Sequence, residues 1–280
     1  MKKILALLLA LTLVLALAAC GGGNDTQEPA AQPAPAETGT PAGADAAKDD
    51  GAAGGALPTV EPGKLIMSTE PSFPPYEMTD DSDNVYGIDP DIAAAIAEKL
   101  GLELVIDPMD FDTALLAVQQ GKCDIVAAGV TVREDRLAVM DFTDTYANGV
   151  QVVIVPEGSD ITLDTLGDQT IGTQRGTTGY IYCSDDFGDD HVIAYDNGIT
   201  AVQALLNGQI DCVVIDSGPA EEFVTVNPGL TILDTEYANE DYAIGLAKNS
   251  PLTEAVNGAL KELIADGTVQ EILDRYIGAE

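Results

Sequence analysis

The sequence is poor in the residues that metal sites and nucleic-acid interfaces require. It has no tryptophan, one histidine, and 12 lysines and arginines against 47 aspartates and glutamates, which gives a formal net charge of -35. A single histidine excludes histidine-rich metal sites. A surface this acidic argues against nucleic acid and anionic lipid as partners. We interpret the acidity as a means of staying soluble outside the cell.

Cysteine is also scarce. Three cysteines follow Cys20, so at least one thiol is free. Cys123 and Cys212 lie in apolar strand patterns, where a free cysteine behaves as a small hydrophobe. A disulfide between Cys183 and Cys212 stays open, because connectivity does not follow from sequence.

Two aspartate-rich segments, Asp80–Asp83 and Asp185–Asp190, lack the regular spacing of a calcium loop. We interpret them as solvated turns. No metal and no cofactor is predicted.

No apolar run has the length of an ordinary membrane-spanning helix. Ile4–Ala19 is apolar, follows two lysines and ends in small residues before Cys20, as an export signal does. Its end resembles a lipobox, which implies removal of residues 1–19 and acylation of Cys20 at the membrane. An ordinary signal with a chance cysteine is the alternative. Residues 20–62, rich in alanine, proline, glycine and acids, are predicted to be a flexible tether.

From Lys64 onward, short apolar strands alternate with amphipathic helices. Asp89-Pro90 is predicted to open a helix as N-cap and first residue, and Gly101 to end it. Strands that alternate with helices predict a mainly parallel sheet covered on both faces. The other predicted elements are the strands Lys64–Thr69, Leu102–Ile106 and Cys123–Ala127 and the helix Asp112–Gln120.

One helix-glycine-strand unit occurs twice. Ala114–Val126 (ALLAVQQGKCDIV) matches Ala201–Val213 (AVQALLNGQIDCV) at a constant offset. The same offset places Asp216 opposite Gly129, so each strand leads into a corner of the kind at which open α/β sheets bind ligands. We therefore predict two α/β lobes that face each other across a cleft.

The chain is predicted to cross between the lobes twice. The apolar run Val150–Val155 leads out of the first lobe and Asp241–Ala247 leads back. Lobe one is predicted to comprise residues 63–149 and 246–280, and lobe two residues 150–245. Two crossings make a hinge.

The stretch Lys122–Arg136 (KCDIVAAGVTVREDR) indicates a strand, a small-residue corner and a helix. Thr131 and Glu134 have the spacing of a helix capping box. Backbone N–H groups at the corner and Arg136 in the opening turns of the helix predict an anion site.

Several motifs, in their order along the chain, resemble the family 3 solute-binding proteins of ABC importers, those for polar amino acids. The resemblance implies a periplasmic-binding-protein-like fold, an amino acid held between the lobes, no chemistry of its own, and a transmembrane permease as partner of a monomer outside the cytoplasm. The motifs are FPPYE (Phe73–Glu77), YGIDPDIAAAIAEKLG (Tyr86–Gly101), PMDF (Pro108–Phe111), AAGVTVREDR (Ala127–Arg136), MDFTDTY (Met140–Tyr146), IGTQRGTT (Ile171–Thr178), NGQIDCVVIDS (Asn207–Ser217) and ADGTVQEILDRYIG (Ala265–Gly278).

The resemblance assigns the ligand's carboxylate to one group of residues. Arg136 matches the family's α-carboxylate ligand, which agrees with the anion site, since a guanidinium can grip a carboxylate through two parallel hydrogen bonds. Gly129 and Thr131 match further contacts. From the facing lobe, Thr177 and Thr178 match donors to the same carboxylate.

Asp216 matches the acid that takes the α-ammonium group. Taken alone, an arginine in the first turns of a helix is more often a surface ion-pair partner. Asp216, likewise, could simply cap a helix that starts near Pro219. The resemblance favours the ligand-binding role for both residues.

The side-chain end of the site is implied in the same way. Phe73 and Phe111 match aromatic positions that sandwich the ligand side chain, and Glu70 matches a position that meets its distal end. Other wall candidates are Ala128, Gln174 and Ile215. Arg133 and Arg175 match outward-facing places, so the wall has no second cation, and a buried ligand carboxylate there would be costly. A cationic or amide side chain is predicted.

Two other functions stay open. Some proteins on this scaffold are cyclohexadienyl or arogenate dehydratases, and Glu70 is the only evident general acid here. Their substrates carry an extra carboxylate, which the missing second cation disfavours. The third possibility is a sensory domain that docks onto a membrane receptor.

Overall fold

The computed structural model describes residues 56–277. The predicted signal peptide, Cys20 and most of the predicted tether therefore lie outside the described residues.

Within residues 56–277, no helix combines the length and the apolar character that crossing a membrane requires.

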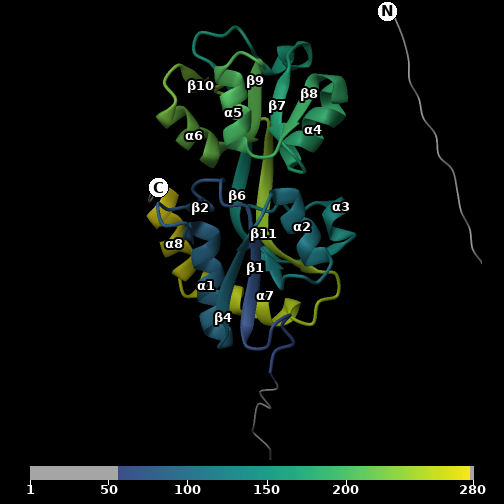
Figure 1. Cartoon of the computed structure of the whole chain (residues 1–280), viewed down its shortest axis with the longest axis vertical. Coiled ribbons are helices and arrows are strands. Elements are labelled where there is room, and N and C mark those ends of the chain that lie inside the picture. Colours follow the sequence, from purple (N-terminus) through teal and green to yellow (C-terminus); the bar gives the residue numbers. More distant parts are fainter. Residues whose placement is uncertain (1–55, 278–280) are drawn as a thin grey trace, which may run out of the picture. The chain divides into compact units, whose positions relative to one another are not determined.

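The two lobes are built around matching sets of parallel strands (Figure 1). In lobe one, β1 (Lys64–Thr69) lies between β4 (Glu103–Pro108) and β5 (Ile125–Val126), parallel to both. In lobe two, β7 (Ile171–Gln174) lies between β8 (Val192–Tyr195) and β9 (Cys212–Asp216) in the same way. This arrangement confirms the predicted two-lobed α/β fold with a mainly parallel sheet in each lobe.

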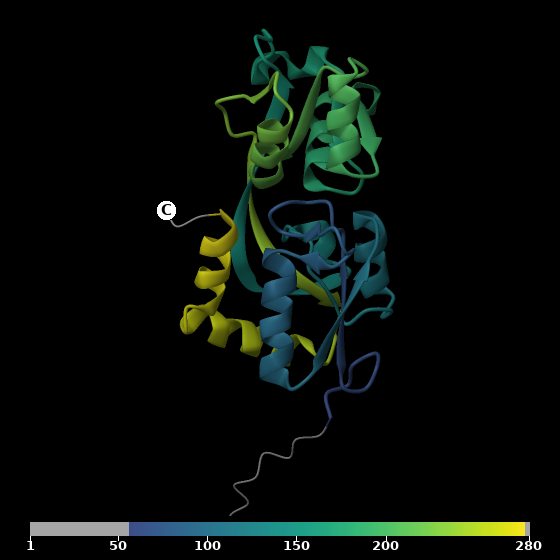
Figure 2. The same ribbon diagram turned by 60° about the vertical axis from the view of Figure 1, so that its left-hand side comes forward.

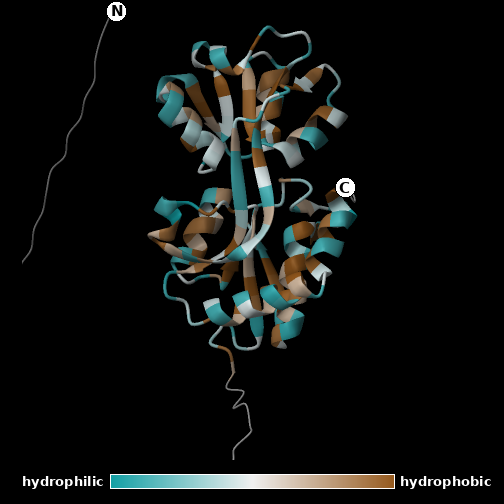
Figure 3. Cartoon of the chain, turned by 180° about the vertical axis from the view of Figure 1, so that it is seen from behind, coloured by the Kyte–Doolittle hydropathy of each residue, from teal (hydrophilic) through white to brown (hydrophobic). Residues whose placement is uncertain are grey.

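Helices cover the sheet and turn their apolar faces toward it (Figure 3). Buried aliphatic side chains of these helices and strands form separate clusters in the two lobes. The helices of lobe one are α1 (Ile88–Leu100), α2 (Phe111–Gln119), α3 (Glu134–Leu137), α7 (Thr253–Ala265) and α8 (Thr268–Ile277). Those of lobe two are α4 (Thr178–Phe187), α5 (Gly198–Leu206) and α6 (Ser217–Val226), with the short 3-10 turns Leu163–Asp168 and Asp189–His191.

The segment between β1 and α1 carries the short hairpin of β2 (Met78–Thr79) and β3 (Val85–Tyr86). It lies on the side of lobe one that faces lobe two (Figure 2). A side chain added at Gly218, in the first turn of α6, would meet Pro75 and Tyr76 of this segment at 3.1 and 3.5 Å. The segment is therefore packed against the facing lobe.

The repeated helix-glycine-strand unit has the same geometry in both lobes. Gly121 and Gly208 each follow their helix with φ 66°, a left-handed conformation that glycine adopts without steric cost. Asp124 and Asp211 then each accept a hydrogen bond from a main-chain N–H of their own lobe, at 2.8 and 2.7 Å. The glycine and the aspartate thus recur because each turn needs both.

Two long antiparallel strands, β6 (Met140–Pro156) and β11 (Ala238–Ala247), connect the lobes. β11 pairs with β5 in lobe one, and β6 pairs with β9 and with β10 (Leu230–Ile232) in lobe two. Within the described residues one nine-stranded sheet therefore runs through both lobes. Both strands are longer than predicted and pass through the predicted lobe limits without a break, so the limits themselves stay a prediction.

The cysteines after Cys20 are all buried and free in the described structure. Cys183 and Cys212 lie in one apolar cluster of lobe two, and Cys123 lies in lobe one. The disulfide that the sequence left open is not formed.

The predicted N-cap of α1 is wrong. The helix begins at Ile88 and its N-cap is Gly87, whose φ is 141° and whose position has no room for a side chain beside the Tyr76 carbonyl. Asp89 lies inside the first turn and is buried. Its carboxylate accepts hydrogen bonds from the Gly129 N–H at 2.8 Å and the Tyr146 hydroxyl at 2.6 Å. Asp89 therefore hydrogen-bonds to tertiary partners, whereas the local pattern predicted that it would cap the helix.

A substitution of Gly149, on β6, tests how closely Tyr242 of β11 and Asp216 pack against this strand. A methyl group there would overlap the Tyr242 ring and lie 2.5 Å from Asp216 Oδ2. We expect Gly149→Ala to lower the free energy of unfolding by about 1–3 kcal/mol. Gly258→Ala is the matched control, because Gly258 is exposed within α7 and its added methyl meets no atom within 4 Å. It should raise stability by about 0.5–1 kcal/mol. Urea unfolding of both variants measures the difference, and equal effects would contradict the packing described.

Candidate functional site

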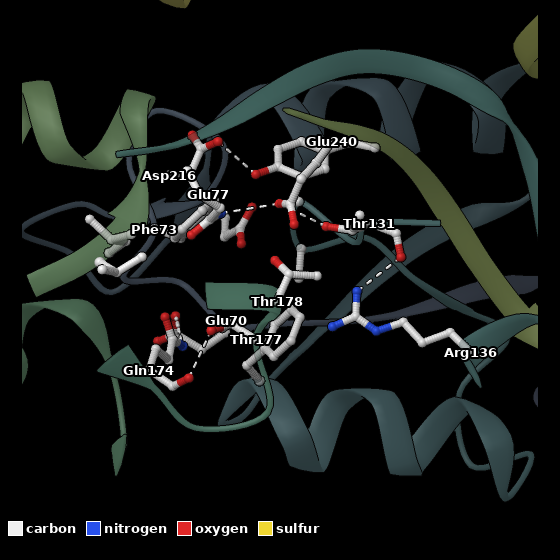
Figure 4. A pocket seen from close by; sticks show the side chains of 17 residues that line it. Glu70, Phe73, Glu77, Thr131, Arg136, Gln174, Thr177, Thr178, Asp216 and Glu240 are labelled. Carbon is white, nitrogen blue, oxygen red and sulfur yellow. Dashed lines mark hydrogen bonds between the residues drawn. The ribbon is translucent and has the colours of Figure 1, made fainter. Parts of the chain in front are cut away.

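A cavity lies between the lobes and is lined by side chains from both (Figure 4). Every residue predicted to bind the ligand lines this cavity, as does the wall candidate Ile215. The predicted residues are Glu70, Phe73, Phe111, Ala128, Gly129, Thr131, Arg136, Gln174, Thr177, Thr178 and Asp216.

The cavity also contains residues that the sequence did not indicate. Gln151, on β6, and Glu240 and Tyr242, on β11, become neighbours of the site only when the two crossing strands pair. Glu77 is the last residue of the FPPYE motif, and its position in that motif was the only available signal. Val214, in β9, precedes the predicted wall residue Ile215.

Arg136 is held at one end of the cavity by backbone carbonyls of both lobes. Nη1 donates to the Thr131 carbonyl at 2.9 Å and Nη2 donates to the Gly176 carbonyl at 3.2 Å. The guanidinium carbon lies 5.6 Å from the centre of the Phe111 ring, a cation–π distance. Only 6% of the residue is exposed, and this burial lowers the pKa of Arg136.

Arg136 forms no ion pair within the part of the chain that the structure describes. A guanidinium has five N–H donors, and the two carbonyls leave some of them free. A buried cation with free donors can bind a carboxylate strongly. This end of the cavity is therefore chemically suited to an anion, and anion binding there stays a prediction.

The predicted capping box at Thr131 is wrong. α3 begins at Glu134, its N-cap is Arg133, and no side chain caps it. Thr131 instead forms a β-bridge with Tyr242, and its hydroxyl donates to Glu240 Oε2 at 3.0 Å. The Thr131 hydroxyl therefore binds Glu240 of β11, which is distant in sequence, and does not cap the helix as the local pattern predicted.

The N-terminus of α4 faces Arg136 from lobe two. Thr177 is the N-cap, since its hydroxyl oxygen accepts from the Tyr180 N–H at 3.3 Å while its own proton goes to the Gln174 carbonyl at 2.8 Å. Thr178 is buried and lines the cavity. The first N–H groups of this ten-residue helix add positive partial charge at the anion end.

Asp216 stands at the opposite corner, where β9 ends. Oδ1 accepts from the Gly218 N–H at 2.9 Å, so Asp216 caps α6, which starts at Ser217 rather than near Pro219. Oδ2 accepts from the Val150 N–H at 3.0 Å and the Tyr242 hydroxyl at 2.8 Å. Capping and lining the cavity are therefore compatible. Burial raises the pKa of Asp216 to about 6.

Glu70 and Gln174 meet across the lobes. Gln174 Nε2 donates to Glu70 Oε2 at 3.2 Å, and the Ser72 hydroxyl donates to Glu70 Oε1. Burial raises the pKa of Glu70. Phe73 packs closely on the backbone of Gly129, where an added methyl would lie 2.9 Å from its ring. This part of the cavity offers a carboxylate, an amide and aromatic faces.

Acidic side chains outnumber cations around the cavity. Four carboxyl groups line it, those of Glu70, Glu77, Asp216 and Glu240, against the single guanidinium of Arg136. Glu77 is fully buried, its two carboxylate oxygens have no hydrogen-bond partner in the described structure, and burial raises its pKa well above the usual range. A further acid, Asp89, is buried beside Glu77, and its pKa is raised to about 6 by burial.

The remaining arginines near the cleft do not enter it. Arg133 pairs with Asp135 at 2.9 Å and lies over the Tyr182 ring at 5.0 Å. Arg175 pairs with Asp196 at 3.2 Å and is half exposed. Neither lines the cavity, so Arg136 is the only cationic side chain among its lining residues in the described structure.

These pKa values predict how the unliganded protein responds to pH. Asp89 and Asp216 titrate near pH 6 in the folded chain but near pH 4 when unfolded, so the folded state binds more protons in between. The free energy of unfolding should therefore fall by roughly 2–3 kcal/mol per group as pH rises from 4 to 6.5. Tyr242 and Glu240 face Asp216, and Tyr146 and Glu77 face Asp89, as part of the same buried cluster. Urea unfolding at pH 4.5, 5.5 and 7.0, together with ¹³C-carboxyl titration, measures this trend. Stability that rises over the range would contradict it.

Comparison with known proteins places this geometry in a family. Residues 65–279 match the model of the bacterial extracellular solute-binding proteins, family 3. Over 290 aligned positions the chain is 30% identical to a probable histidine-binding protein of Neisseria gonorrhoeae, covering 100% of this chain and 97% of the relative. It is 28% identical to the L-cystine-binding protein TcyJ of Escherichia coli K12, over 79% of this chain and 85% of that one.

A solved structure agrees with these relatives. The arginine-, lysine-, histidine-binding protein ArtJ of Geobacillus stearothermophilus superposes with a TM-score of 0.74 and 30% sequence identity, covering 78% of this chain and 96% of that one. The family match spans both lobes and the whole cavity. The chain therefore belongs to the bacterial extracellular solute-binding proteins, family 3.

Proposed function

We propose that the protein captures a cationic amino acid, with arginine as the first candidate, and delivers it to the permease of an ABC importer. The observation that carries this proposal is the charge of the cavity, which is lined by four buried carboxyl groups and only one guanidinium. An amino acid with a cationic side chain brings one carboxylate for Arg136 and two cations for the acids. A ligand with a second carboxylate would leave a buried charge without a partner, which is costly.

The shape of the site supports the same ligand. The carboxylate binds Arg136 and the N-terminus of α4, and the α-ammonium group binds Asp216. The side chain then extends between Phe73 and Phe111 toward Glu70. A planar guanidinium stacks well on aromatic faces and pairs with a carboxylate through two hydrogen bonds. Among the named relatives, the Neisseria gonorrhoeae protein is a probable histidine-binding protein and ArtJ is an arginine-, lysine-, histidine-binding protein. TcyJ is an L-cystine-binding protein.

Binding of such a ligand would hold the lobes together. Arg136 and Glu70 belong to lobe one, and Thr178, Gln174 and Asp216 belong to lobe two, so each end of the ligand contacts both. β6 and β11 provide the two crossings at which the lobes can rotate. The ligand thus supplies the energy that favours the closed form over the open one.

The amide alternative and the enzyme alternative differ in what the cavity must hold. A glutamine side chain can hydrogen-bond Glu70 and Gln174 but leaves the charge of Glu70 unpaired. A cyclohexadienyl acid brings a second carboxylate to a cavity with one cation, so no observation favours dehydratase activity. Incubation with prephenate or arogenate, followed by a search for phenylpyruvate or phenylalanine, tests that alternative directly.

The transport role also needs an anchor and a tether. We propose that residues 1–19 are removed, that Cys20 is acylated, and that residues 20–62 link the lipid to a monomer outside the cytoplasm. The limits 63–149 with 246–280 for lobe one and 150–245 for lobe two belong to the same proposal. Metabolic labelling with a clickable fatty acid, with Cys20→Ser as the unlabelled control, tests the anchor.

The ligand is identified by a thermal-shift screen. The chain from Gly63 onward, which contains both lobes, is heated with each of the twenty amino acids, ornithine, citrulline and cystine. A ligand that binds the folded state raises the melting temperature by mass action. We expect arginine, lysine, ornithine or histidine to raise it most. Stabilisation by glutamate or aspartate alone would contradict the charge argument.

Arg136→Ala should weaken arginine binding by at least roughly 100-fold, because it removes a charge-assisted grip on the α-carboxylate. Arg175→Ala is the matched control, since Arg175 pairs with Asp196 outside the cavity. It should leave the dissociation constant within about threefold of the original value. Isothermal titration calorimetry measures both, and equal affinities of the two variants would refute the assignment of Arg136.

Glu70→Gln should change selectivity rather than remove binding. The variant keeps the shape of the side chain but loses the charge that faces the distal end of the ligand. We expect the affinity for arginine to fall about tenfold or more while that for citrulline, its neutral analogue, changes little. Glu98→Gln, an exposed substitution on α1, serves as control. Parallel losses for arginine and citrulline would show that Glu70 does not contact the cationic group.

A further inference from the structure

Glu240 has an unusual environment for a residue on a hinge strand. It lies on β11 opposite Gly149 of β6, and only 5% of it is exposed. Oε2 accepts two hydrogen bonds, from the Thr131 hydroxyl at 3.0 Å and from Gln151 Nε2 at 3.1 Å. Oε1 is buried, has no partner within residues 56–277, and belongs to a side chain that lines the cavity (Figure 4).

A buried carboxylate oxygen without a donor is costly, because it has lost its water and gained nothing in return. Arg136 attracts this carboxylate but donates no hydrogen bond to it, since its two hydrogen bonds go to the carbonyls of Thr131 and Gly176. The free oxygen therefore indicates that a donor arrives with the ligand.

The position of Glu240 identifies that donor. Glu240 and Tyr242 are two residues apart on β11, so their side chains leave the same face of the strand. The Tyr242 hydroxyl is bonded to Asp216, which places Glu240 beside the corner assigned to the α-ammonium group. Thr131, on the other side of Glu240, is 4% exposed and also lines the cavity.

The hydrogen bond between Thr131 and Glu240 sets the polarity of this corner. A threonine hydroxyl has one proton and two lone pairs. Because the proton is given to Glu240 Oε2, the hydroxyl can act toward the cavity only as an acceptor. Asp216 accepts three hydrogen bonds, which leaves room for one more on a carboxylate with about four acceptor positions. The corner thus offers three acceptors, and a primary ammonium group has three N–H donors.

We propose that Glu240 is a second acidic residue of the ammonium subsite. It accepts one N–H of the ligand's α-ammonium group through Oε1, and through Oε2 it orients the Thr131 hydroxyl to accept another. The inference rests on the proposed function, because it presupposes an α-amino acid in the cavity, and it adds a specificity-determining residue on the hinge itself.

Glu240 also contacts residues of both crossing strands' surroundings, because it hydrogen-bonds to Thr131 of lobe one and to Gln151 of β6. Its partner Gln151 lies on β6, and an added methyl on Gly179 of α4 would lie 2.7 Å from the Gln151 amide oxygen. Thr131 belongs to lobe one, whereas α4 belongs to lobe two. A donor bound at Glu240 therefore strengthens a set of contacts that reaches from one lobe to the other.

The test compares two ligands that differ only in the amino group, L-arginine and 5-guanidinopentanoate. Dissociation constants are measured by calorimetry for the original chain, for Glu240→Gln and for the exposed control Glu254→Gln on α7. We expect Glu240→Gln to weaken arginine binding at least tenfold and to change 5-guanidinopentanoate binding less than threefold. The control should change neither.

Two results would overturn the proposal: an unchanged affinity for arginine, or an equal loss for both ligands, which would mark Glu240 as purely structural. If the original chain binds arginine and Glu240→Gln binds it with unchanged affinity, only this inference fails. If the original chain binds no α-amino acid, the proposed function fails together with it. Should Glu240→Gln not fold, Thr131→Val carries the same comparison, because it removes the hydroxyl that Glu240 orients. An equal loss for both ligands in Thr131→Val would again overturn the proposal.

Discussion

The hydrogen-bonded ladder between β6 and β11 is the interaction on which the rest of the structure depends. It joins the parallel strands of lobe one to those of lobe two in a single sheet. It also brings residues from the two crossing strands to the centre of the cavity, where Gln151 and Glu240 share a hydrogen bond. Gly149 has no side chain because Tyr242 and Asp216 occupy the space beside it. The two crossing strands therefore line the cavity as well as joining the lobes.

The electrostatics of the cavity oppose the stability of the unliganded fold. Glu77 and Asp216 have pKa values raised by burial, and Arg136 has a pKa lowered by burial, so each charged form is disfavoured where it lies. A molecule that brings opposite charges to these groups removes part of that penalty. Under the proposed function, selectivity and the cost in stability would come from the same buried charges, and such perturbed groups cluster at functional sites.

Local patterns in the sequence were sufficient for the architecture. The repeated helix-glycine-strand unit, with Gly121 and Gly208 in the same left-handed conformation, correctly indicated two equivalent lobes. The predicted caps at Asp89 and Thr131 were wrong because both side chains have better partners far away in sequence, Tyr146 and Glu240.

The site could be predicted only where a residue lies in a motif. Arg136, Asp216 and the other predicted residues were named through the family resemblance, and they do meet at one cavity. Gln151 and Glu240 carry no local signal, since each looks like an ordinary polar residue at the edge of an apolar strand. Their role depends on the register between two strands that are almost ninety positions apart, and register is a property of the folded sheet.

The hydrogen bond from Arg136 to the Gly176 carbonyl joins the lobes directly, as does the one from Gln174 to Glu70. These direct contacts between the lobes must break before the lobes can move apart. Under the proposed function, these contacts would act on the rate of ligand exchange as well as on affinity. A bound amino acid would leave only when the lobes separate, so its residence time would include the time needed to break them. A permease that pulls the lobes apart would shorten that time without touching the ligand.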